Sequence, residues 1–384
     1  MSDAPATRLE CAACGAAPDA RAPWRCPNAG RDDLDHIVAR RLDAARATFP
    51  CAGAVNPFVR FRTLLHSYHA ARAGGMSDAD FVALVEELDR AVAEVDSRGF
   101  VATPFARSGA LGESLGFASG GGVWVKDETG NVSGSHKARH LFGIALVLEV
   151  MERTGLASRA EHDRRGLAIA SCGNAALAAA VVARAARRPL EVFIPPDADP
   201  KVVKRLQSLD AHIAVCPRAP GEKGDPCYHA FRRALEAGAL PFCCQGSDNG
   251  LTIEGGETLA WEIAAALADD GLTLDRLFVQ VGGGALASAC AQGLREAVSL
   301  GALAKLPQLH AVQTFGAFPR AARATPPTRR PPSACARPTP RTSCARSCAT
   351  RRPTAPSSCG RGRSRRGASP TASWMTRPTT GTRW

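Results

Sequence analysis

The segment from residue 103 to residue 313 alternates short apolar runs with helical patterns, and this order constrains the fold more than any other feature. The apolar runs that predict strands lie at 123–125, 167–170, 190–194, 212–215, 277–281 and 310–313. The helical patterns between them lie at 137–152, 175–187, 200–209, 228–237, 254–268 and 286–299. Near-continuous apolar strands, each followed by a helix, predict parallel twisted sheets covered by helices. We expect an α/β fold with two lobes, because 384 residues exceed what one core usually organises.

Three regions flank this α/β region, which we place at residues 103–316. Residues 1–31 are rich in cysteine, and residues 32–102 carry apolar residues at helical spacing, with Ser77 as a helix N-cap. We therefore expect a helical N-terminal region over residues 32–102. Residues 317–384 contain no Leu, Ile or Val, so they cannot bury a core of their own and are predicted to be disordered.

The formal charge of +12 is unevenly distributed along the chain. Residues 317–384 hold 15 Arg and no Lys, Asp or Glu, whereas the first 316 residues hold 33 basic and 36 acidic residues. Clustered arginines attract phosphate groups, so a nucleic-acid-binding protein acting through this tail is the alternative function. The tail offers only Phe318, Trp374 and Trp384 for stacking on bases, and we expect no specific nucleic-acid partner.

The sequence shows neither a secretion signal nor a membrane span. Its first 15 residues lack a basic region followed by an apolar block. The most apolar stretch, residues 166–183, is interrupted by polar residues at 171–174. We expect a cytoplasmic protein with reduced cysteines and no membrane partner.

The first cysteines form half of a zinc-ribbon pattern. Cys11 and Cys14 are separated by two alanines, and Cys26 precedes a proline, but no second Cys-x-x-Cys pair follows. His36 or Cys51 could supply a fourth ligand. A degenerate, non-metal segment is the more common outcome for such a pattern, and a structural zinc on Cys11, Cys14 and Cys26 is the alternative.

Candidate site residues lie in the loops between strands and helices, where ligands of parallel sheets bind. Lys137 stands at a predicted helix start, where the helix dipole disfavours a second positive charge and so favours an imine. Amides at 171–174 could hold a carboxylate, and the glycines at 282–284 leave N–H groups free for a phosphate. A capped helix start or a flexible turn explains each loop taken alone, including the acidic loop at 249–258.

As a set, these segments resemble the fold-type II pyridoxal-phosphate enzymes, the tryptophan synthase β superfamily. The resemblance rests on Lys137 in a Gly-Ser-x-Lys turn, Ser-Cys-Gly-Asn at 171–174, Ile-Glu-Gly at 253–255 and the triglycine at 282–284. The opening cysteines also resemble the start of threonine synthase-like members. The resemblance implies a pyridoxal 5′-phosphate-dependent lyase or synthase of amino-acid metabolism, similar to threonine synthase or threonine dehydratase. It further implies a homodimer and a smaller mobile lobe at about residues 140–215.

The resemblance also implies a role for each matching residue. Lys137 would form an internal aldimine with the cofactor and then remove the substrate α-proton. The implied cofactor-binding residues are Lys137, Asn174 (which would contact the 3′ oxygen), Gly282, Gly283, Gly284, Ala285 and Leu286. The implied substrate-binding residues are Ser171, Cys172, Gly173, Asn174 and Ala175. The chemistry would be β/γ-elimination or replacement on a serine- or threonine-like amino acid.

The chain departs from the family pattern at several positions. Cys172 stands where members usually have a second Ser or Thr, and His136 stands where many have Phe. Members also continue after residues 311–313 with a strand and helices, and a residue there contacts the pyridine nitrogen. Residues 325–384 resemble a GC-rich gene translated in the wrong frame. We hypothesise a frameshift near residues 314–325, which would put the activity of this form in doubt.

Overall fold

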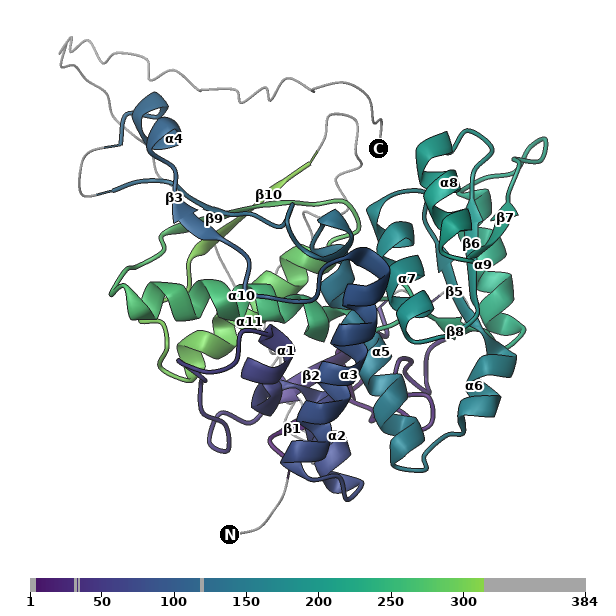
Figure 1. The fold of residues 1–384 in the computed structure, drawn as a ribbon, viewed down its shortest axis with the longest axis horizontal. Helices are drawn as coiled ribbons and strands as arrows, with labels where there is room; N and C mark the ends of the chain where they lie inside the picture. The colour runs from purple at the N-terminus through teal and green to yellow at the C-terminus, as the bar shows by residue number, and fades with distance from the viewer. Residues whose placement is uncertain (1–4, 31–32, 34, 118–120, 314–384) are drawn as a thin grey trace, which may run out of the picture. The chain divides into compact units, whose positions relative to one another are not determined.

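The computed structural model describes residues 5–30, 33, 35–117 and 121–313 (Figure 1). All of them belong to one compact unit, residues 1–321. The predicted disorder of residues 317–384 falls outside the described residues. Within the described part, no helix is long and apolar enough to cross a membrane.

The first lobe contains a four-stranded parallel sheet in the order β7-β6-β5-β8. Its strands are β5 (Leu167–Ala170), β6 (Leu190–Ile194), β7 (His212–Val215) and β8 (Leu240–Pro241). The helices α7 (Asn174–Ala185), α8 (Pro200–Ser208) and α9 (Pro226–Glu236) connect them, and α6 (Arg159–Arg165) precedes β5. Right-handed crossovers put α7 and α8 on one face and α9 on the other (Figure 1). The chain passes from β5 outward through β6 to β7 and then returns to form β8 on the other side of β5. The strand order therefore switches direction between β5 and β8, and folds of this kind bind ligands at such a switch point.

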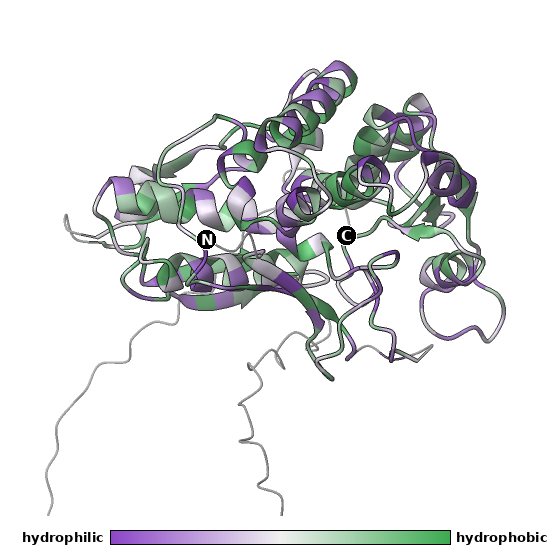
Figure 2. Ribbon diagram, turned by 90° about the horizontal axis from the view of Figure 1, so that it is seen from below, coloured by the Kyte–Doolittle hydropathy of each residue, from purple (hydrophilic) through white to green (hydrophobic). Residues whose placement is uncertain are grey.

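The second lobe is built on three helices and a short parallel sheet. The helices are α5 (Lys137–Arg153), α10 (Thr252–Asp269) and α11 (Ala285–Ser299), and the strands are β9 (Arg276–Gln280) and β10 (Gln308–Val312). α11 connects β9 to β10, and α10 packs against both α11 and α5 (Figure 1). Most side chains of α5 and α10 are buried. On helices at the surface of the molecule, hydrophilic and hydrophobic residues lie side by side (Figure 2).

The strand predictions at 167–170, 190–194 and 212–215 are confirmed residue for residue. The other three predicted strands exist with ends shifted by one or two residues, as β4 (Trp124–Lys126), β9 and β10. The short strand β3 (Phe105–Arg107), which pairs with β4, and the helix α4 (Gly109–Ser114) were not predicted. β8 joins the sheet of the first lobe, so that lobe extends beyond the expected limit of residue 215.

The N-terminal region differs from the expected helical region at its beginning. β1 (Thr7–Cys11) pairs antiparallel with β2 (Val38–Leu42), and the helices α1 (Pro57–Arg60), α2 (His66–Ala73) and α3 (Asp78–Asp96) follow. β2 forms a strand because the side chains of Val38 and Arg40 are buried on one face while its backbone bonds to β1. Ser77 caps α3 as predicted, and the Asp80 side chain completes a capping box.

α5 and α10 cross so closely that two glycines are required at the crossing. A Cβ added to Gly255 would lie 2.0 Å from the backbone oxygen of Arg139, and one added to Gly143 would lie 2.9 Å from the Cα of Gly255. Aromatic rings fill the space beside α5, where the centroids of Phe58 and Phe142 are 4.6 Å apart. This crossing holds the start of α5, and with it Lys137, against α10.

Gly255→Ala is expected to lower the free energy of unfolding by about 1–3 kcal/mol, because the new methyl group meets backbone that cannot move aside. Gly112→Ala is the matched control, since Gly112 also lies within a helix and an added Cβ meets nothing within 4 Å. Urea unfolding of both variants measures the difference. Equal stability of the two variants would contradict the close crossing.

Candidate active site

Lys137 is the first residue of α5 and is half-buried. Its N-cap, His136, makes no side-chain capping bond. Among the described residues, the Lys137 ammonium has no hydrogen-bond or ion-pair partner. Burial raises the pKa of the Cys244 thiol, and the charge of Lys137 opposes that rise. Lys137 therefore lies beside the loop that follows β8.

Two histidines next to Lys137 are neutral at pH 7. Burial, reinforced by neighbouring positive charges, lowers the pKa of His136 to about 3 and that of His140 to about 3. The ring of His140 lies 2.6 Å, Nδ1 to oxygen, from the backbone carbonyl of Thr252 and donates a hydrogen bond to it. Neither imidazole adds a positive charge beside Lys137.

A balanced network of buried charges fixes the beginning of α5. Arg139, two residues after Lys137, has no exposed side-chain surface and bonds Glu128 at 2.8 Å and Glu262 at 2.6 Å. Lys126 also contacts Glu262, at 2.5 Å. Two cations thus face two carboxylates, so each buried charge has a partner.

Two helices start at glycines that leave backbone N–H groups free. α7 has Gly173 at its N-cap and α11 has Gly284, whose φ is +90°, and neither helix start has a side-chain cap. Polar side chains cap six other described helices: Asn56 on α1, Ser77 on α3, Ser108 on α4, Ser158 on α6, Asp199 on α8 and Asp225 on α9. A Cβ added at Gly282, Gly283 or Gly284 would meet nothing within 4 Å, so this loop borders open space. Free N–H groups at a helix start attract anions.

The loop at 171–175 follows the carboxyl end of β5, next to the point where the strand order of the sheet switches direction. Ser171 accepts a 3.4 Å hydrogen bond from the Gly173 backbone, and Asn174 and Ala175 begin α7. The Cys172 side chain is exposed, and partial desolvation together with two nearby aspartates raises the pKa of its thiol. Because β5 and β8 are neighbours, this loop and the loop beside Lys137 leave the same edge of the sheet.

A cavity of about 340 Å³ joins the glycine loop to the loop after β8. Gly283, Gly284 and Ala285 line one side, and residues 245–247 line another. Lys137 and residues 171–175 are not among its lining residues, nor are Gly282 and Leu286. Of the predicted site residues, the cavity thus brings Gly283, Gly284 and Ala285 next to the loop that follows β8, while Lys137 lies near Cys244 of the same loop.

A buried charge cluster that the sequence did not reveal forms the wall of this cavity. The Arg40 side chain contacts Glu254, Glu257 and Glu296, with its Nη2 2.7 Å from Glu296 Oε1. Burial raises the pKa of Glu254 to about 7 and that of Glu257 well above its ordinary value, although Arg40 opposes both rises. The sequence presents Glu254 and Glu257 as a helix start, with Glu254 inside the Ile-Glu-Gly segment of the resemblance, and gives no sign of a partner at Arg40.

The three predicted metal ligands do come together. The side chains of Cys11, Cys14 and Cys26 form one group with His36, whereas Cys51 is exposed and lies outside the group. The structure therefore selects His36 of the two residues that the spacing allowed.

A two-lobed α/β fold, with a lysine at a helix start and glycine-capped helices at strand ends, is compatible with an enzyme that binds a phosphorylated cofactor. Residues 97–355 match the family described as "Pyridoxal-phosphate dependent enzyme", and the chain belongs to this family. Pyridoxal 5′-phosphate is the cofactor of the family.

Individual relatives match over shorter stretches. L-serine dehydratase of Saccharomyces cerevisiae is 29% identical over 175 residues, which cover 44% of this chain and 50% of that protein. The serine dehydratase-like protein of Homo sapiens is 30% identical over 196 residues, covering 51% and 53%. The structure of threonine deaminase isoform 2 from Solanum lycopersicum matches with a TM-score of 0.43 and 19% identity, covering 63% of this chain and 58% of that one. The chain spans about half the length of the curated relatives that it matches.

The contribution of Glu254 to the free energy of unfolding is expected to fall as the pH rises from about 5 to 8. Glu254 has a pKa of about 7 in the folded protein against an ordinary value of 4.5, so the folded state binds more protons in this range. The expected loss is about 1–3 kcal/mol. Glu254→Gln removes this negative contribution, so the slope of unfolding free energy against pH should be more positive than in the wild type, whereas Glu113→Gln, at an exposed position of α4, should leave the slope unchanged. Urea unfolding across this pH range measures the slopes, and equal slopes for both variants would contradict the assignment.

Proposed function

We propose that this chain binds pyridoxal 5′-phosphate through Lys137 and acts on a serine- or threonine-like amino acid. The reaction would remove the α-proton and then eliminate or replace a group at the β or γ carbon. The observation that carries the proposal is the position of Lys137. Lys137 begins α5 and has no charged partner among the described residues. It lies near the carboxyl ends of β5 and β8, where the strand order of the sheet switches direction.

The glycine loop is the proposed phosphate site. The backbone N–H groups of residues 282–286 would donate hydrogen bonds to the phosphate, and the dipole of α11 would add attraction. The open space around the three glycines leaves room for the group, which supports the assignment. The Asn174 amide would donate a hydrogen bond to the 3′ oxygen of the cofactor.

The start of α7 is the proposed site for the substrate carboxylate. The Ser171 and Gly173 N–H groups already have protein acceptors, but α7 has no side-chain cap, so the N–H groups of Asn174 and Ala175 can donate to a carboxylate. The raised pKa of the Cys172 thiol keeps it neutral at pH 7, so it does not repel that carboxylate.

Proton transfer is the proposed role of the Lys137 amine. When bound, pyridoxal 5′-phosphate delocalises the electron pair left at the substrate α-carbon. Lys137 would take the α-proton at Nζ and hold it during departure of the leaving group. The neutral rings of His136 and His140 keep a second positive charge away from this amine. Arg139 and its carboxylate partners would keep the amine in position.

Lys137→Ala is expected to abolish covalent capture of the cofactor and to lower turnover of L-serine or L-threonine by at least about 10²-fold. Lys201→Ala is the matched control, because Lys201 also lies in the first turn of a helix but is exposed. Visible absorbance after cofactor addition, borohydride reduction and peptide mass mapping locate the attachment. 2-Oxo acid release measures turnover. Capture on another lysine would contradict the proposal.

Gly283→Asp is expected to weaken cofactor binding at least about tenfold without loss of stability. The added carboxylate would repel the phosphate, while the new Cβ meets nothing within 4 Å. Gly109→Asp places the same charge at the exposed start of α4 and should leave binding unchanged. Absorbance titration with pyridoxal 5′-phosphate gives both affinities. Unchanged affinity in Gly283→Asp would place the phosphate elsewhere.

A further inference from the structure

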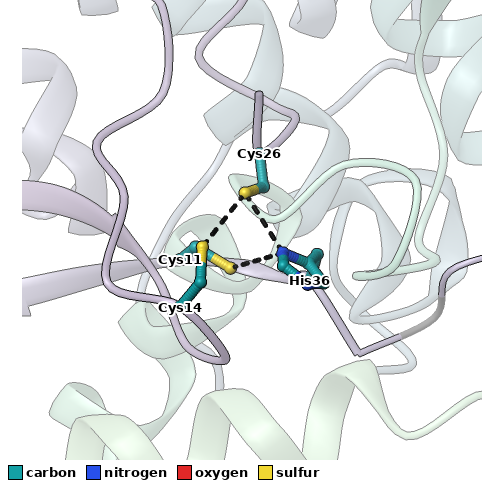
Figure 3. A group of neighbouring side chains, drawn as sticks. All are labelled: Cys11, Cys14, Cys26 and His36. Carbon is teal, nitrogen blue, oxygen red and sulfur yellow. Dashed lines mark hydrogen bonds between the residues drawn. The ribbon is translucent and has the colours of Figure 1, made fainter. Parts of the chain in front are cut away.

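The group formed by Cys11, Cys14, Cys26 and His36 has the dimensions of a tetrahedral metal site. Its four ligand atoms all lie within 4.8 Å of one another (Figure 3). The Sγ atoms of Cys14 and Cys26 are 3.6 Å apart, and His36 Nδ1 is 3.6 Å from Cys11 Sγ and 3.4 Å from Cys26 Sγ. Zn–S bonds of about 2.3 Å and Zn–N bonds of about 2.0–2.1 Å in a tetrahedron separate the ligand atoms by about 3.5–3.8 Å.

Neighbouring groups are arranged as around a bound metal. The Nε2 atom of His36, which faces away from the thiols, lies 3.4 Å from the Asp33 carboxylate. A carboxylate on the far nitrogen orients a metal-binding imidazole and raises its basicity. Asn28 directs its backbone N–H to Cys26 Sγ at 3.4 Å and its side-chain amide to Cys14 Sγ at 3.5 Å. These N–H groups stabilise sulfur that carries negative charge.

The local backbone also fits a metal-binding turn. The Gly15 N–H donates to the Cys11 carbonyl at 2.9 Å, and the positive φ of Gly15, +74°, lets the chain fold back after Cys14. The Cys11 N–H donates to the Ala16 carbonyl at 2.8 Å. Both sulfurs of the Cys-x-x-Cys pair are thereby turned toward Cys26 and His36.

We propose that Cys11, Cys14, Cys26 and His36 bind one Zn²⁺ ion as a structural site. Three thiolates and one imidazole complete a tetrahedron, so no position is open for catalysis. Soft thiolate ligands favour zinc over magnesium or calcium. The site involves residues outside the pyridoxal-phosphate site and does not depend on the proposed function.

The zinc ion would hold the β1–β2 pair against the second lobe. Cys11 ends β1 and is paired in register with Val38, the first residue of β2. The Val38 carbonyl packs so tightly on Gly250 that a Cβ there would lie 1.9 Å from it. Arg40, two residues further along β2, enters the cluster on α10 and α11. The metal would thereby fix the end of β1 next to the start of β2, which is the part of the N-terminal segment that packs on the loop after β8.

Metal analysis of the full chain, purified under reducing conditions, is expected to give about one Zn²⁺ per chain. Co²⁺ in place of Zn²⁺ should give the intense visible bands of a tetrahedral thiolate site. Cys26→Ser and His36→Ala should weaken Zn²⁺ affinity at least about tenfold in competition with a chromophoric chelator. His36→Cys should restore tight binding, because a fourth thiolate also completes the tetrahedron.

Cys51→Ser is the matched control, since this exposed cysteine lies outside the group and its loss should leave zinc bound. Hydrogen exchange of the β1–β2 amides should accelerate at least about tenfold when a chelator removes the metal. Reduced wild-type protein that binds no Zn²⁺ in the titration would overturn the proposal. A Cys14–Cys26 disulfide that persists in protein isolated from zinc-containing medium would assign the pair to redox chemistry instead.

Discussion

The buried guanidinium of Arg139 is the interaction on which the rest of the site depends. A charge in the protein interior is costly unless it is paired and hydrogen-bonded. Arg139 meets that requirement through Glu128 after β4 and through Glu262 on α10, with a further 3.0 Å bond to the Thr258 hydroxyl. The start of α5 can therefore be in place only when these segments, distant in sequence, have assembled around it. The position of Lys137 is thus a property of the whole second lobe.

The second buried cluster has an excess of negative charge, unlike the balanced network around Arg139. Arg40 is one cation among three carboxylates, whereas Arg139 and Lys126 together face two. Burial raises the pKa values of Glu254 and Glu257, the neighbouring carboxylates add to the rise, and the single Arg40 only partly opposes it. Association of the N-terminal strands with α10 and α11 is therefore coupled to proton uptake. The network around Arg139 has no such excess.

The sequence predicted the strands β5, β6 and β7 to the residue because these strands are apolar at most positions. β1 and β2 were missed because their ten residues include three arginines, and their pairing spans the whole cysteine segment. Similarly, the spacing left His36 and Cys51 open as the fourth ligand, since the choice depends on how the chain folds back. The burial of Arg40 could not be predicted, because nothing in the sequence distinguishes this arginine from the exposed ones.

The residue type at each helix N-cap gives information that the spacing of apolar residues does not contain. Replacing a polar N-cap by an apolar residue such as Ala costs about 0.5–2 kcal/mol, whereas Gly costs only a few tenths. This chain uses Asn, Ser or Asp at the six helix starts that its own side chains cap. It uses glycine at α7 and α11, where the free N–H groups face a strand end. Glycine leaves those donors uncovered at little cost, so an anionic ligand can complete the helix start. α2, α5 and α10 also lack a side-chain cap, so the feature that sets α7 and α11 apart among the described helices is glycine at the N-cap.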